Sequence, residues 1–387
     1  MTRWTNKREH LAAVIGMLLL PLAAVHAADK PRAAEKVKAA DADKLFPDKD
    51  GFFIPRAPYL YDPISKDVGD PTILFNHASG ESWVFYTQRD TMKAEGSGWY
   101  HGSDIGMQSS MFDGFSWLYR GAAEGLNTYM PGRNTFWAPE VVYHDGTYHM
   151  YVTFRVGVPM YAGERAGTYE YDEPNSKSRG ILHYTSTNLM LWSFEARLAL
   201  APDNGSVIDA GVHPLRNGAW RMWYRAFDAA HKPILGYADS KDLVHWENRG
   251  LAVDYEGYAE GPCVFYWKEQ FWMLLDGMSE KYRPAEGGLA VLKSADATQW
   301  EFQQGGLAYD STTRAKDGKP GHCSVVVQGE RAFILYHCFA PGARGATGQL
   351  AELLVTDGKL SCVREFGRMK LEASKAPLFR GGQCPNF

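Results

Sequence analysis

Three carboxylates stand at the opening of apolar runs, a setting in which they could do acid and base chemistry. Glu260 precedes the run "GPCVFYW", Asp70 precedes "PTILFN", and Asp209 precedes "AGVHPL". A single carboxylate at the start of such a run is most often a solvated surface group. Several brought to one place can instead divide the work of catalysis, because one carboxyl donates a proton while another activates water. The elements that carry them decide between these readings.

The chain from Gly51 onward has the pattern of an all-β protein. Short runs rich in Val, Tyr, Trp and Phe alternate with Gly, Asp and Asn turns, and helical periodicity nearly vanishes. One strand occurs in five versions, each preceded by a turn and another apolar run: 81–87, 146–153, 218–226, 269–277 and 331–337. Four of the repeats close on a turn of the form S-x-D/N-x-x-x-W. Hairpins at this long period, roughly 50–75 residues, predict a five-bladed β-propeller over residues 51–366.

The residue that opens the first strand of each repeat lies near the propeller axis, since the first strand of a blade is the innermost. Counting back from the second strands gives, in order, Asp70, Trp137, Asp209, Glu260 and His322. Polar groups in a protein interior are costly unless they are paired, so packing does not explain this set. Two carboxylates across a wide axis suit inverting glycoside hydrolysis, and a third can raise the pKa of the acid. An indole offers a stacking surface for a sugar ring.

Five segments together resemble the five-bladed glycoside hydrolases of family 43: "GDPTILF", "FWAPEVVYHDGTYHMYVT", "VIDAGVHPLRNGAWRMWY", "EGPCVFYWKEQFWML" and "GHCSVVVQGERAFILYH". The resemblance implies that Asp70 is the general base, Glu260 the general acid, and Asp209 the residue that tunes and orients the acid. It also implies that His322 is a channel histidine near a Ca²⁺ or Na⁺ ion, held mostly through waters, with no other cofactor required.

The sequence is also similar to glycoside hydrolase family 117, the anhydro-galactosidases of agar breakdown. In that family a His commonly precedes the Glu of the E-G-P motif and is implicated as the acid, whereas this chain has Ala259 there. The difference favours Glu260 as the acid. A family 117-like activity and a sugar-binding propeller without catalysis are the alternatives to a family 43-like hydrolase of plant or algal oligosaccharides.

Arginines at the ends of second strands bear on the substrate. Arg89, Arg155 and Arg225 occupy three such ends, and His337 occupies a fourth. Arginine binds carboxylate and sulfate through two parallel hydrogen bonds, which predicts an acidic terminal sugar, a uronate or a sulfated unit. The alternative is that these arginines pair with the three carboxylates and only hold them.

Two long segments, 89–106 and 154–180, are rich in Gly, Tyr and charge and would wall the site. They favour exo action on a chain end. Their His101, Asp104 and Tyr161 are further candidate substrate contacts.

The N-terminus has the pattern of a signal peptide over residues 1–27, with a positively charged start, an apolar stretch and small residues before a cleavage point after Ala27. An uncleaved anchor is disfavoured because Pro21 interrupts a stretch that is short for a membrane span. We therefore expect a periplasmic or secreted protein with a short leader over residues 28–50 and no membrane association after cleavage.

Charge and cysteine content add few constraints. A formal net charge of −4 suggests no nucleic-acid partner. The five cysteines lack the C-x-x-C spacing of a zinc site, and a bridge from Cys362 to Cys384 would staple the C-terminal tail, residues 367–387. We expect a monomer or a homodimer.

Overall fold

The computed structural model describes residues 52–53, 59–76, 78–89, 102–110, 116–130, 134–155, 179–200, 207–230, 232–284, 288–309, 320–339, 345–364 and 366–367. All of them belong to one compact unit, Asp50–Phe387. The predicted signal peptide and leader lie outside the described residues, as do His101, Tyr161 and Cys384. What was expected of them, the bridge to Cys384 included, stays a prediction.

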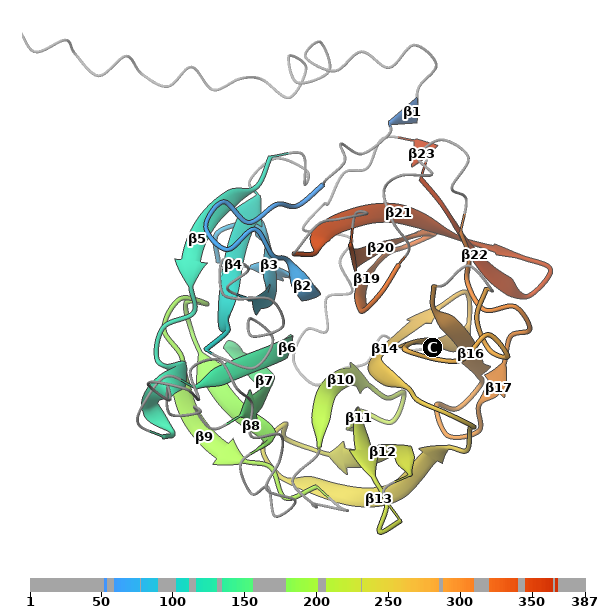
Figure 1. Cartoon of the computed structure of the whole chain (residues 1–387), viewed down its shortest axis with the longest axis horizontal. Coiled ribbons are helices and arrows are strands. Elements are labelled where there is room, and N and C mark those ends of the chain that lie inside the picture. Colours follow the sequence, from blue (N-terminus) through green and yellow to red (C-terminus); the bar gives the residue numbers. More distant parts are fainter. Residues whose placement is uncertain are drawn as a thin grey trace, which may run out of the picture. The chain divides into compact units, whose positions relative to one another are not determined.

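The described residues form five sheets around a central axis, antiparallel except for one short parallel pair in the fifth, which confirms the predicted all-β, five-bladed propeller (Figure 1). Blade 1 contains β2 (Gly69–Asn76), β3 (Glu81–Gln88), β4 (Asp104–Ser110) and β5 (Leu118–Ala122). Blade 2 contains β6 (Thr135–His144), β7 (Thr147–Arg155), β8 (Arg179–Ser186) and β9 (Ser193–Arg197). Blade 3 contains β10 (Ile208–Pro214), β11 (Trp220–Phe227), β12 (Pro233–Ser240) and β13 (Trp246–Val253).

Blade 4 contains β14 (Glu260–Trp267), β15 (Gln270–Asp276), β16 (Ala290–Ser294) and β17 (Glu301–Phe302). Blade 5 contains β19 (Cys323–Gln328), β20 (Arg331–Cys338), β21 (Thr347–Thr356) and β22 (Lys359–Val363), and β18 (Ala308–Tyr309) joins its outer edge. A small separate pair joins β1 (Phe52–Phe53) to β23 (Phe366–Gly367). The helix among the described residues is a single 3-10 turn, Leu126–Thr128, and no described helix is long and apolar enough to cross a membrane.

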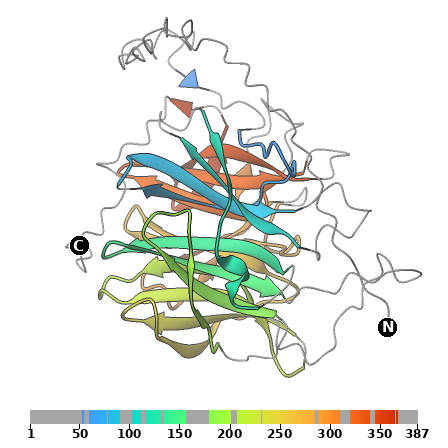
Figure 2. The ribbon, with the colours of Figure 1, turned by 90° about the vertical axis from the view of Figure 1, so that its left-hand side faces the viewer.

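The blades hold together by apolar contact between neighbouring sheets. The second strands are buried on both faces, as their dense apolar sequences predict; β3 is buried along its whole length. Figure 2 shows blades 1, 2 and 3 following one another around the ring in blue, green and yellow-green. Apolar contact also closes the ring between blades 1 and 5. There Val68 and Val84 pack with Phe333 and Leu335 in one core.

The Ser and Asp/Asn of the repeated turn motif shape the connection between the third and fourth strands. In blade 3 the Ser240 hydroxyl accepts a hydrogen bond from the N–H of Leu243. The Asp242 carboxylate accepts hydrogen bonds from the N–H groups of Val244 and His245. These bonds hold Leu243 at a φ of 63° with its side chain fully buried. The turns at 186–189 and 294–297 repeat the arrangement, which explains the recurrence of the motif.

Candidate active site at the propeller axis

A β-bulge opens the innermost strand in four blades. The register between first and second strands shifts directly after Gly69, Trp137, Ile208 and Glu260. The residue that follows each of these has a positive φ: 46° at Asp70, 44° at Ala138, 57° at Asp209 and 58° at Gly261. Bulges re-aim side chains at the end of a ladder, and here they do so at the strand ends that meet beside the axis.

The bulges correct the sequence alignment of the five blades by one residue. Asp70 and Asp209 occupy the second bulge position, whereas Trp137 and Glu260 occupy the first. Equal counting had placed all of them at a single equivalent position. The hairpins that join the first two strands differ in length between blades, so an equal count along the sequence does not reach equivalent positions. The five residues still open the five innermost strands, but as two kinds of position.

A ring of side-chain caps joins each blade to the next. In blades 1, 2 and 4 the residue opposite the first bulge position accepts a backbone N–H of the following blade, and in blade 5 His337 does so without a bulge. The caps are Ala138 N–H to Thr87 Oγ1 (2.8 Å), Asp209 N–H to Thr153 Oγ1 (2.9 Å), His322 N–H to Asp276 Oδ2 (2.9 Å), and Asp70 N–H to His337 Nδ1 (3.0 Å). In blade 3 the corresponding residue is Arg225, opposite Ile208. An arginine has no acceptor, and the Gly261 N–H bonds to the carboxylate of Asp209 instead.

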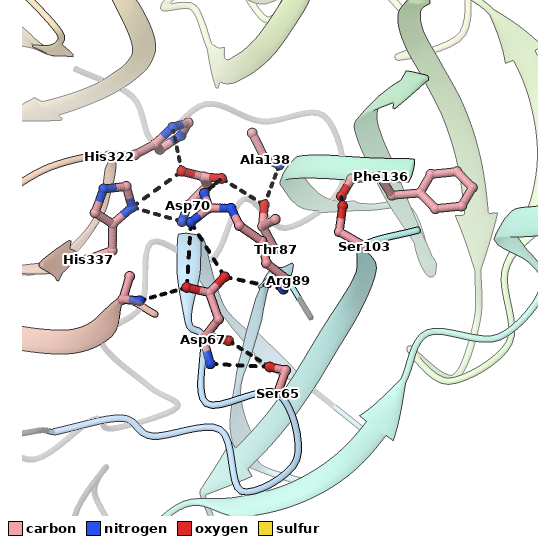
Figure 3. A network of polar contacts seen from close by, with 11 residues as sticks. Ser65, Asp67, Asp70, Thr87, Arg89, Ser103, Phe136, Ala138, His322 and His337 are labelled. Carbon is pink, nitrogen blue, oxygen red and sulfur yellow. Dashed lines mark hydrogen bonds and ion pairs between the residues drawn. The ribbon is translucent and has the colours of Figure 1, made fainter. Parts of the chain in front are cut away.

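Asp70 lies in a dense network of donors and cations (Figure 3). Its Oδ2 accepts hydrogen bonds from Thr87 (2.8 Å) and Arg89 (3.0 Å), and its Oδ1 faces Nδ1 of His337 (3.3 Å) and of His322 (3.6 Å). Burial opposes ionisation of the carboxyl, but Arg89 and the two histidines outweigh it and hold the pKa of Asp70 far below its usual range. These contacts favour the carboxylate form of Asp70, which is the form required of a base.

Arg89 is engaged on both sides. Besides Asp70, its guanidinium reaches Asp67 at 3.4 Å, and the side chains of all three are nearly buried. Asp67 in turn accepts the N–H of Ala346 from blade 5 (2.6 Å), and burial raises its pKa. The two roles considered for the arginines were binding the substrate and holding a carboxylate in place. The geometry of Arg89 favours the second role.

The two histidines differ in their protonation. The backbone N–H of Asp70 donates to Nδ1 of His337, so the proton of the neutral ring lies on Nε2. Burial disfavours the cation, but the Asp70 carboxylate outweighs burial and raises the pKa of His337. For His322 burial dominates and lowers the pKa. A Cβ at position 261 would lie 2.7 Å from Nδ1 of His322, which together with its positive φ requires the glycine that follows Glu260.

Asp209 and Glu260 both favour the protonated form. Burial raises the pKa of Asp209 well above its usual range, and the charges of Glu260 and Asp70 add to this. Burial also raises the pKa of Glu260; a hydrogen bond from the Tyr258 hydroxyl lowers it, and the charge of Asp276 raises it again. The end of the axis thus combines one carboxyl whose pKa is lowered, Asp70, with two whose pKa is raised, Asp209 and Glu260. Asp276, a fourth acidic residue opposite Glu260, was missed as a site residue although "LLDGM" ends a predicted strand.

Arg225 is buried, with 5% of its surface exposed, and lies between two aromatic rings. The Phe227 ring centroid is 4.1 Å from its guanidinium carbon and that of Tyr258 is 4.7 Å away. In the part of the chain that the structure describes, the Arg225 guanidinium makes no hydrogen bond and no ion pair, and its Nε is buried without a partner. Its charge acts on Asp209 and Glu260 only through space.

The remaining predicted contacts lie near the same strand ends. Trp137 is half-buried at the first bulge position of blade 2. Arg155 is buried at the end of β7, opposite Thr135. Asp104 begins β4. Arg89 and Arg155 lie two residues beyond the capping position that Arg225 occupies, so the three arginines do not share one position, contrary to the sequence interpretation.

No group of three or more His, Cys, Asp or Glu among the described residues has the arrangement to hold a metal ion. His322 has Asp70 and Asp276 as acidic neighbours. Its predicted association with a Ca²⁺ or Na⁺ ion stays a prediction, and no chemical step below depends on an ion.

Comparison with known proteins identifies the family to which the chain belongs. The family model of glycosyl hydrolases family 43 matches residues 116–355, more than half of the chain. The chain belongs to glycosyl hydrolase family 43. This confirms the family resemblance, and the protein is a glycoside hydrolase. No curated protein matches the chain in a sequence search.

Solved structures of three other proteins share the fold. A thermostable family-43 glycoside hydrolase superposes with a TM-score of 0.59 at 17% identity, covering 84% of this chain and 100% of its own. The endo-arabinase from Bacteroides thetaiotaomicron gives 0.53 at 18% identity, covering 78% and 99%. The α-L-arabinofuranosidase from Lactobacillus brevis gives 0.55 at 16% identity, covering 78% and 95%. At these identities the likeness concerns the propeller and not the substrate.

Proposed function

We propose that this family 43 enzyme is an exo-acting, inverting glycoside hydrolase of plant or algal oligosaccharides whose terminal sugar carries a negative charge. Asp70 is the general base that activates water, Glu260 is the general acid that protonates the leaving oxygen, and Asp209 tunes and orients the acid. The long segments 89–106 and 154–180, which support exo action, lie mostly outside the described residues, so this element rests on the sequence alone.

The protonation states support the division between base and acid. Inversion needs an ionised carboxylate and a protonated carboxyl on opposite sides of the scissile bond, with room for water between them. Arg89 and the histidines favour the ionised form of Asp70, whereas burial favours the protonated form of Glu260. The two groups belong to blades 1 and 4 and make no hydrogen bond with each other.

The observation that supports an anionic substrate is the isolation of Arg225. Leaving a cation buried without a counter-ion costs several kcal/mol, so such a residue is commonly retained for a ligand. The charge of Arg225 acts on Asp209 and Glu260, but burial raises the pKa of both carboxyls, and neither makes a hydrogen bond or an ion pair with the guanidinium. A carboxylate or sulfate on the terminal sugar would supply the missing charge and accept the free N–H groups.

The test compares 4-nitrophenyl β-D-glucuronide and α-D-galacturonide with 4-nitrophenyl β-D-xyloside and α-L-arabinofuranoside, in the wild type, R225M and R249M. Arg249 is a matched control because it lies on the exposed outer strand β13 and pairs with Asp239 and Glu247. We expect a uronide to be the better substrate, R225M to lose about 30-fold or more in kcat/KM on it, and R249M to lose nothing. A preference for a neutral glycoside, unchanged in R225M, would overturn the anionic assignment.

The stereochemical part has its own test. Proton NMR of the first product released should show the anomer opposite to that of the substrate, with mutarotation to the equilibrium mixture following. Initial release of the retained anomer would rule out inversion. Absence of hydrolysis on the whole glycoside panel and on agar-derived oligosaccharides would favour a sugar-binding propeller, and hydrolysis of the agar-derived oligosaccharides alone would favour the family 117-like alternative.

A further inference from the structure

Tyr258 contacts both the proposed acid and the isolated cation. Its hydroxyl donates to Oε2 of Glu260, and this is the one hydrogen bond that the Glu260 side chain makes among the described residues. Its ring lies against the Arg225 guanidinium, 4.7 Å from centroid to guanidinium carbon. Tyr258 is itself 36% exposed, so its place beside Glu260 is not a consequence of core packing.

The backbone of the neighbouring strand is shaped to admit the tyrosine ring. Gly277 has a φ of 72°, and a Cβ there would lie 2.8 Å from Cδ1 and 3.1 Å from Cε1 of Tyr258. The same Cβ would lie 3.8 Å from Cγ of Glu260. Any larger residue at position 277 would push the ring away, so the glycine after Asp276 keeps the phenol against the carboxyl.

We propose that Tyr258 is a positioning residue for the acid, whose hydroxyl holds Oε2 of Glu260 so that the transferable proton is carried on Oε1. The inference rests on the proposed role of Glu260. Burial and the charge of Glu260 raise the pKa of the phenol, which therefore keeps its proton and remains a donor. An oxygen that accepts this hydrogen bond is the poorer place for the acid's own proton, so the other oxygen carries it.

The hydrogen bond also acts after the proton has left. When Glu260 gives its proton to the leaving oxygen, the carboxylate that forms is stabilised by the Tyr258 hydroxyl, as a donor stabilises any developing anion. The cation over the ring favours this further, because the positive charge of Arg225 acts to lower the pKa of the phenol and so makes its hydroxyl a better donor. Tyr258 thus makes Glu260 a stronger acid at the moment of transfer, and its loss is felt most where the leaving oxygen is basic.

The experiment uses Y258F, which keeps the ring against Gly277 and Arg225 and removes only the hydroxyl. The matched control is Y255F, three residues earlier, because the Tyr255 hydroxyl is buried and has no hydrogen-bond partner among the residues that the structure describes. The probes are the methyl and 2,4-dinitrophenyl glycosides of the best sugar from the panel above. The readouts are kcat/KM against pH and the melting temperature.

For Y258F we expect kcat/KM on the methyl glycoside to fall about 10-fold and on the dinitrophenyl glycoside by less than about 2-fold, since a hydrogen bond to a charged group is lost where the acid is needed. The pH at which activity declines on the basic side should rise, because removing a donor to the ionised form raises the pKa of Glu260. The melting temperature should not change, and Y255F should match the wild type throughout.

The inference would be overturned if the basic limb of the kcat/KM profile and the ratio of kcat/KM between the two glycosides were the same in Y258F as in the wild type. It would also be overturned if Y255F showed the same changes as Y258F. E260Q measured in parallel separates this from the proposed function. If E260Q loses activity selectively on the methyl glycoside while Y258F does not, only the positioning role is wrong. If E260Q shows no such selectivity, the acid assignment itself is wrong.

Discussion

Replacing Arg89 by methionine tests whether this arginine holds Asp70 or binds substrate. Arg89 joins two carboxylates, Asp70 at 3.0 Å and Asp67 at 3.4 Å, and the exposed fractions of the three side chains are 7%, 13% and 1%. Removing one partner of an ion pair that is so little exposed costs roughly 3–5 kcal/mol, because the carboxylates stay buried without a counter-ion. An unfolding entropy of about 2.1 cal/mol/K per residue gives about 1.4 °C per kcal/mol for the unit Asp50–Phe387, so R89M should melt roughly 4–7 °C below the wild type at pH 7.

The pH dependence gives the sign of the effect. The pKa of Asp70 is depressed in the folded protein, so its contribution to stability is present above the pKa of the unfolded chain and is lost on acidification. In R89M the pKa of Asp70 rises, so the deficit in melting temperature should be largest near neutral pH and shrink toward pH 4. The acid limb of kcat/KM should move to higher pH, because the base must be ionised to act.

Thermal melts from pH 4 to 8 and pH profiles of kcat/KM on the preferred 4-nitrophenyl glycoside provide the assay. The control is K232M, which removes an exposed pair with Asp254, 52% and 84% exposed, and should cost less than about 1 kcal/mol. A melting temperature within about 2 °C of the wild type, together with an unmoved acid limb and a raised KM on uronides alone, would refute the structural role and make Arg89 a substrate ligand.

Three further variants probe the rest of the site. D209N should lose about 100-fold in kcat and yet melt higher than the wild type at pH 8 but not at pH 4, because burial raises the pKa of Asp209 and its ionisation at higher pH destabilises the fold. D276N keeps an acceptor for the His322 N–H but removes the charge that raises the pKa of Glu260, so the basic limb should move to lower pH; a limb that moves upward would contradict this. W137A should raise KM about 10-fold at an unchanged melting temperature if Trp137 stacks on sugar. A lower melting temperature at unchanged KM would instead make it a core residue.

The hairpins could be predicted because their strands either alternate apolar and polar residues or are mostly apolar where the strand is buried. The segment "ESWVFYT", which lies within the fully buried β3, is of the second kind. The convergence of the strand openings followed from propeller geometry. The bulges could not be predicted, since an extra residue at Asp70 or Asp209 changes no composition and only its positive φ marks it. Trp137 and Glu260 were placed one residue out of register because the first hairpin differs in length between blades, as the pairs Gly69 with Thr87 and Trp137 with Thr153 show.

The partners of charged groups were also beyond the sequence. No sequence feature near Arg89 indicates that it pairs with Asp67, and none distinguishes Arg89 from Arg225. In the structure Arg89 pairs with two carboxylates, whereas Arg225 pairs with none among the described residues. The ring of side-chain caps distinguishes Arg225, which lies at a capping position, from Arg89, which does not. Thr87, Thr153, Asp276 and His337 each accept an N–H from the next blade, and only the register shows that Arg225 stands at the same position.

The most direct test of the assignment of Glu260 as acid and Asp70 as base is the leaving-group dependence of their amide variants. The measurement is the ratio of kcat/KM for the 2,4-dinitrophenyl and methyl glycosides of the preferred sugar, in the wild type, E260Q and D70N. The assignment predicts that E260Q loses about 10²–10⁴-fold on the methyl glycoside and less than about 10-fold on the dinitrophenyl glycoside, while D70N loses at least about 10²-fold on both. Equal losses on both glycosides in E260Q, or selective loss on the methyl glycoside in D70N, would contradict it.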